Sequence, residues 1–187
     1  PYFYSELGYE ILTEIQAGWR TLGVGDDAFN PLALFTSRPR PIVVEPPGRA
    51  SGLVPRLENY RSELARLATF LQNNKVPVLF LLPPQNLADF RPFGSMAKPD
   101  TTPALLEELN TKLISALDAP VEDAKDAYLE ILRIDDGIAE ANFQIGQYYL
   151  RDNEIDKARE HLWKANDRDL ILKRVPSSFH DISRSFV

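Results

Sequence analysis

The chain has 187 residues, of which 44% are hydrophobic and 26% charged, and its formal net charge at pH 7 is −6. This composition is typical of a globular protein with a core, and the acidic balance argues against nucleic-acid binding. The absence of cysteine excludes disulfides and thiolate metal sites. No apolar stretch approaches the ~20 residues of a membrane-spanning helix, and no signal peptide is evident. Because the chain begins at Pro1 rather than Met, we expect an internal piece of a longer protein.

The first predicted element is a helix that begins near Ser5 and ends at Gly23. Glu6, Glu10 and Glu14 form a row opposite its apolar face, and we interpret this row as solvated rather than as a metal or acid/base site. The following residues, 25 to 55, are rich in Pro and Gly and predict a long connection in which Ile42 to Val44 is the one candidate strand. In the first helix, predicted from Ser5 to Gly23, the apolar face consists of Leu7, Ile11, Ile15, Trp19 and Leu22.

A broad apolar stripe predicts a second helix from Leu57 to Asn73, and the unbroken apolar run Val78 to Leu82 follows it. This run is too short for a buried helix and is closed by Pro83 and Pro84, so it predicts a strand covered on both faces. Such strands are typical of the parallel sheet of an α/β domain.

A polar loop leaves the carboxyl end of the predicted strand, where open α/β sheets place their ligands. Its candidate ligand-binding residues are Asn86, Asp89 and Arg91: Asn86 can donate to a substrate, and Asp89 can accept from it or position Arg91. The alternative, which turn chemistry favours, is that Asn86 and Asp89 form turn or N-cap hydrogen bonds and that Arg91 pairs with Asp89.

After a linker over residues 99 to 103, the pattern predicts only helices and short turns as far as Asp169. Thr101 or Thr102 is the expected N-cap of the first of these helices, with Pro103 near its first position. A repeat with the tetratricopeptide period of 34 residues is present. Its first copy, Ala124, Tyr128, Ile131 and Asp135, recurs as Ala158, Leu162, Ala165 and Asp169.

The later copy has most of the repeat pattern. Gly146 and Ala158 are small residues, expected where two helices cross closely, while Tyr149, Leu162 and Ala165 are expected to fill the groove between them. Two departures are Leu170 at the usual closing proline and Lys112 at the glycine position of the earlier copy. Two such hairpins alone would leave apolar surface uncovered, so we expect them to pack on the α/β part or on a partner.

The pattern after Asp169 predicts a last helix capped by Ser177 or Ser178, whose buried side is Phe179, Ile182 and Phe186. His161 is expected on the solvated side of a repeat helix. His180 is expected to be half buried and structural, because a general base needs a nucleophile and an orienting acid beside it.

The whole order of segments resembles the SGNH (GDSL-like) hydrolases that carry tetratricopeptide repeats. The resemblance rests on the loop P-P-Q-N-L-A-D-F-R-P-F-G-S after the predicted strand, the repeat insertion, and the return sequence R-V-P-S-S-F-H-D-I-S-R. It implies a flavodoxin-like three-layer sandwich, hydrolysis of esters or acyl groups by a serine, and an extracytoplasmic location with a membrane tether outside this chain.

The family's catalytic blocks are missing from this sequence. The only similar glycine step, Gly25-Asp26-Asp27, has no hydroxyl, no Gly-x-Asn block is found, and Asp-x-x-His is absent because Ala158 and Ser177 stand three residues before the two histidines. No catalytic residue is therefore assigned, and neither a metal site nor a cofactor is predicted.

These observations predict a partial α/β SGNH-like domain over residues 1–100, tetratricopeptide-like helical hairpins over 101–169 and a return helix over 170–187, mostly helical in this chain. Two functions stay open. The chain is part of an SGNH-hydrolase-like protein whose catalytic residues lie outside it and whose repeat binds a protein partner, or it is a non-catalytic tetratricopeptide subunit of a larger assembly.

Overall fold

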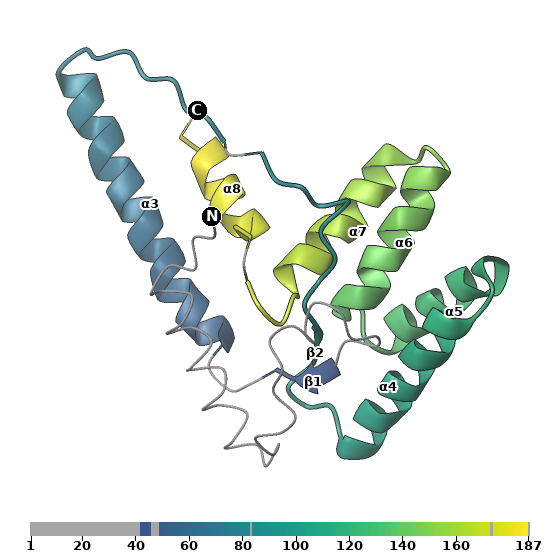
Figure 1. Ribbon diagram of the computed structural model, residues 1–187. Coiled ribbons are helices and arrows are strands. Elements are labelled where there is room, and N and C mark those ends of the chain that lie inside the picture. Colours follow the sequence, from purple (N-terminus) through teal and green to yellow (C-terminus); the bar gives the residue numbers. More distant parts are fainter. Residues whose placement is uncertain (1–41, 46–48, 83, 173, 187) are drawn as a thin grey trace, which may run out of the picture. The chain divides into compact units, whose positions relative to one another are not determined.

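A computed structural model describes residues 42–45, 49–82, 84–172 and 174–186 of the chain (Figure 1). These residues belong to one compact unit, Pro39–Val187. They are mostly helical and include one small parallel sheet, which agrees with a helix-rich α/β class. The helix predicted over residues 5 to 23 and its row of glutamates lie outside the described residues. In chain order the elements are β1 (Ile42–Val44), α3 (Arg49–Asn73), β2 (Ser95–Ala97), α4 (Pro103–Asp118), α5 (Val121–Ile134), α6 (Ala139–Arg151), α7 (Ile155–Asp167) and α8 (Ser177–Arg184).

The sheet consists of β1 and β2, which pair in parallel with Ile42 opposite Ser95 and Val44 opposite Ala97. The ladder continues by one bond from the backbone N–H of Glu45 to the carbonyl of Ala97 (2.9 Å). β1 is the very short strand that the sequence predicts, and that prediction is confirmed. β2 was missed, because Ser-Met-Ala is too short to carry a strand pattern.

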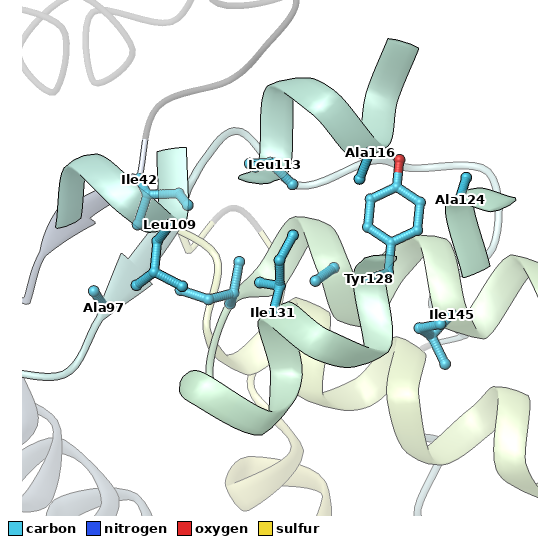
Figure 2. Packing of buried hydrophobic residues seen from close by; sticks show 11 residues of the cluster. Ile42, Ala97, Leu109, Leu113, Ala116, Ala124, Tyr128, Ile131 and Ile145 are labelled. Atoms are coloured by element: carbon cyan, nitrogen blue, oxygen red, sulfur yellow. The ribbon is translucent and has the colours of Figure 1, made fainter. Parts of the chain in front are cut away.

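Helices α4 to α7 follow one another through connections of two, four and three residues, and each packs against the next. Short connections place successive helices side by side and antiparallel. Facing apolar residues of α4, α5 and α6 form the main core together with Ile42 of β1 and Ala97 of β2, and Tyr128 of α5 is directed toward Ala116 of α4 (Figure 2). The predicted succession of helices and short turns is confirmed.

The start of α4 follows its prediction, and the start of α8 does not. Thr102 is the N-cap of α4, since its hydroxyl accepts from the backbone N–H of Leu105 (3.3 Å), and Pro103 is the first helical residue. In α8 the predicted cap Ser177 is itself the first helical residue, after Pro176. Its backbone N–H and hydroxyl donate to the carboxylate of Asp167, so Ser177 ties α8 to the end of α7.

α3 begins at Arg49, earlier than predicted, and Pro55 lies inside it. The Pro- and Gly-rich pattern predicts that Pro55 belongs to the preceding connection, and the structure corrects this: the helix includes it although proline removes a backbone donor. Val54 and Leu57, on either side of it, line an open groove of about 350 Å³ together with Ile182 of α8. α3 nevertheless continues through Pro55 and packs against α8, where the rings of Tyr60 and Phe179 lie 5.1 Å apart.

The prediction of a buried strand at Val78 to Leu82 is wrong. Residues 76–82, which we call the exposed run, have no regular structure, and the side chains of Leu79 and Leu81 are 82% and 81% exposed. An apolar run becomes a covered strand only where neighbouring strands and helices receive it. Within the described residues β1 and β2 pair only with each other, and the exposed run does not join their sheet.

Candidate functional site

The polar loop after the exposed run is held first by a turn. The backbone N–H of Asp89 donates to the side-chain oxygen of Asn86 (2.8 Å), and the amide of Asn86 donates to the Asp89 carboxylate (3.2 Å). Both side chains are exposed. Asn86 and Asp89 therefore make the reciprocal turn bonds that the alternative interpretation of the sequence describes.

Arg91 turns into the helical part of the molecule. Its Nε lies 2.9 and 2.8 Å from the two oxygens of Glu140 on α6, and its Nη2 lies 2.8 Å from Oε1. The side chains of Arg91 and Glu140 are only 15% and 1% exposed. The expected pairing of Arg91 with Asp89 is corrected by this finding, because a forked, desolvated partner binds a guanidinium more strongly than an exposed turn residue does.

Other groups of α6 contact the same loop. Gln147 donates to the backbone carbonyl of Ala88 (2.5 Å), and Phe143 belongs to a cluster with Leu87 and Ala88. At the start of the helix the backbone N–H of Glu140 donates to the hydroxyl of Ser95 (2.9 Å). The loop therefore runs along α6 from its end toward its beginning.

The two repeat aspartates hold the two ends of β2. Asp135 accepts from the backbone N–H of Lys98 (2.8 Å) and from that of Gly137, two residues on. Asp169, 34 residues later, accepts from the backbone N–H of Phe93 (2.8 Å) and from that of Ile171, again two residues on (3.3 Å). The sequence period is thus repeated as a pair of equivalent carboxylates, each at the end of a second repeat helix. The sequence pattern marks both positions as equivalent in the repeat but does not predict these bonds.

Asp169 is also a perturbed acid. Burial raises the pKa of its carboxyl to about 6, although the backbone N–H donors and Arg174, whose Nη2 lies 3.9 Å away, favour the ionised form. Removal from water therefore outweighs these partners.

The loop is joined to α8 through Gln85. Its amide nitrogen donates to the carbonyl of Val175 (3.0 Å) and lies 2.9 Å from Nε2 of His180. The carbonyl fixes which end of the amide is the nitrogen, so we infer that His180 accepts at Nε2 and carries its proton on Nδ1. Arg174 adds bonds to the carbonyls of Asn86 (3.2 Å) and Phe90 (2.9 Å).

His180 and Ser183 share α8 and line a cavity of about 190 Å³, but their contacts are structural. Ser183 donates its only hydroxyl proton to the carbonyl of Phe179 (2.8 Å), so Tyr60 of α3 is the donor in its 2.8 Å bond to Ser183. The edge of Trp163 packs against His180, which is buried.

His161 is partly buried rather than solvated, which corrects its prediction. Its Nδ1 lies 2.9 Å from the side-chain oxygen of Asn142, and its ring packs against Tyr149. Burial lowers the pKa of the imidazole. Outward helical positions are misjudged where a large neighbouring side chain such as Tyr149 covers them.

The remaining repeat residues lie at the crossing of α6 and α7. Ala158, Leu162 and Ala165 are buried, and a methyl group added to Gly146 would come within 2.7 Å of Leu162 Cγ. Tyr149 is partly buried between the ammonium groups of Lys125 and Lys157, 5.2 and 5.3 Å from its ring centre.

The described residues contain no group of three or more metal-ligating side chains, and none of their helices combines the length and apolar character needed to cross a membrane. Comparison with known proteins gave no significant match to a family model, a curated protein or a solved structure.

Proposed function

We propose that the chain is the repeat-bearing part of an SGNH-hydrolase-like protein, in which the helical hairpins are an insertion between two segments of the hydrolase domain. The observation that carries this proposal is the junction of the loop with α8. Gln85 bonds to both Val175 and His180, about ninety residues along the chain.

An inserted domain leaves and returns at neighbouring points of its host, because the host fold must close around it. The two segments that bear the resemblance behave in this way. The loop of residues 83–95 precedes the hairpins, the return sequence of residues 174–184 follows them, and Arg174 spans the two through its bonds to Asn86 and Phe90.

The exposed run is in keeping with the same proposal. In the family a loop of this type follows a central strand, and a central strand has neighbours on both edges and both faces. Val78, Leu79, Leu81 and Leu82 are all exposed and only Phe80 is partly buried, so this apolar run is largely uncovered. Further strands and helices of the hydrolase domain would cover this run.

In this proposal the chain positions the loop and does not supply the chemistry. The nucleophilic serine and its histidine would belong to Gly-Asp-Ser and Asp-x-x-His blocks before and after these residues, and would transfer an acyl group from an ester to water. The histidine within the return helix is already engaged with Gln85, as a structural group would be.

The test is to express the longest natural open reading frame that contains these residues and treat it with a fluorophosphonate probe. We expect one labelled serine within a Gly-Asp-Ser block and loss of labelling and of esterase activity on its replacement by alanine. The proposal would be refuted by a folded full-length protein that the probe does not label and in which the two blocks do not flank these 187 residues.

A second candidate is a non-catalytic subunit of an assembly, in which a partner covers the exposed run. The exposure of Leu79 and Leu81 favours it equally, since apolar side chains gathered on a surface are typical of an interaction site. The two candidates differ in one result: an assembly subunit would remain unlabelled by the probe and would co-purify with a partner that protects residues 76–82 from hydrogen exchange.

A further inference from the structure

Three acidic side chains of the repeat contact one continuous stretch of the chain. Asp169 accepts from the backbone of Phe93, Asp135 accepts from that of Lys98, and Glu140 binds the guanidinium of Arg91. We call Asp135, Glu140 and Asp169 the carboxylate face, and residues 86–98 the docked segment. All three carboxylates are buried beneath it.

Most of these contacts recognise backbone rather than side chains. Asp135 and Asp169 bind backbone N–H groups, and Gln147 binds a backbone carbonyl. Such contacts depend little on the side chains of the bound segment. Glu140 adds the selective element, because a buried carboxylate requires a cation and its two oxygens match the fork of an arginine.

The direction and apolar contacts define the ligand further. The docked segment runs from the end of α6 toward its beginning, with Leu87 and Ala88 against Phe143 and Leu162 before the arginine. Phe93, two residues after Arg91, is fully buried. The complementary ligand is a peptide with a Leu-Ala step, then Arg-Pro-Phe.

We propose that the carboxylate face is a recognition surface for an arginine-bearing peptide, and that this chain occupies it with its own docked segment. The hairpins are then closed to a protein partner on this face while the docked segment is in place. A segment joined to its site has an effective concentration on the order of millimolar, so a free peptide competes poorly against it. This proposal does not depend on the hydrolase assignment.

The experiment uses a fluorescent peptide that copies residues 86–98 and the whole chain carrying Arg91→Glu, which sets two carboxylates against each other and detaches the docked segment around residue 91 from α6. We expect the peptide to bind this variant at least tenfold more tightly than the unaltered chain. A peptide with glutamate in place of its arginine should not bind. Arg66→Glu, which changes an exposed ion pair with Glu63, is the matched control and should behave as the unaltered chain.

Equal peptide affinity for the unaltered chain and a folded Arg91→Glu variant would overturn the proposal. Circular dichroism checks the fold, and Arg91→Ala replaces the variant if the charge reversal unfolds it. A third measurement needs no variant: millimolar peptide should accelerate hydrogen exchange at the Phe93 amide of the unaltered chain. Unchanged exchange there would also count against the proposal.

Discussion

The exposed run and the docked segment lie only a few residues apart in the sequence but differ in burial. The exposed run, V-P-V-L-F-L-L, is the more apolar of the two and is largely in contact with solvent. The docked segment contains Asp89, Arg91, Gly94 and Ser95, yet its residues 92–97 are buried. Burial here follows the available partners rather than hydrophobicity, because α6 and the repeat aspartates receive one segment and no described element covers the other.

The largest expected effect comes from two phenylalanines that differ in burial. Phe93 of the docked segment is 2% exposed, and Phe70 of α3 is 63% exposed. Phe93→Ala should lower the free energy of unfolding by about 3–5 kcal/mol, because it removes buried contacts and leaves a cavity. Phe70→Ala is the matched control and should change it by less than about 0.5 kcal/mol. Urea unfolding measures both, and similar losses for the two variants would contradict the contrast.

The buried ion pair should come next in size. Glu140→Ala leaves the guanidinium of Arg91 without its carboxylate in a site shielded from water, and we expect a loss of roughly 3 kcal/mol in the free energy of unfolding. The same change at Glu63, whose pair with Arg66 is exposed, should cost less than about 1 kcal/mol. Hydrogen exchange should then be faster at residues 91–98 in the first variant only. Unaltered exchange there would show that Glu140 does not hold the docked segment.

Asp169 gives the docked segment a pH dependence. Its pKa is raised from 3.8 to about 6 in the folded chain, so the folded state holds the proton more tightly than the unfolded state does. The contribution of Asp169 to the free energy of unfolding is therefore fully present below about pH 4. It is lost as the pH rises through 6, by up to roughly 3 kcal/mol.

Asp169→Asn isolates this contribution, because asparagine retains an acceptor for the Phe93 N–H but does not ionise in this range. The difference in unfolding free energy, unaltered chain minus variant, should fall between pH 4.5 and pH 7. A difference that rises with pH would mean that Arg174 and the backbone donors outweigh burial.

The sequence alone predicts the helical part of this fold and misses the connections between segments that are distant along the chain. Thr102, Pro103 and the 34-residue period are local or regular signals, and they place α4 to α7 correctly. The pairing of Arg91 with Glu140 spans 49 residues and leaves no local pattern. The nearest signal was the period itself, since Asp135 and Asp169 are equivalent positions. Their shared role at the ends of β2 depends on a strand too short to predict.

The smallest expected effect concerns the exposed run. Leu79→Ser combined with Leu81→Ser should change the unfolding free energy of the 187-residue chain by less than about 0.5 kcal/mol, because neither side chain gives up buried area. In the full-length protein the hydrolase proposal requires both leucines to be covered, and the same pair should then cost about 3 kcal/mol or more. An equally small effect in the 187-residue chain and in the full-length protein would show that the exposed run remains uncovered. It would then have no neighbouring strands, and the hydrolase proposal depends on them. A large loss in the short chain would instead mean that the run already packs there, and the contrast with the docked segment would not hold.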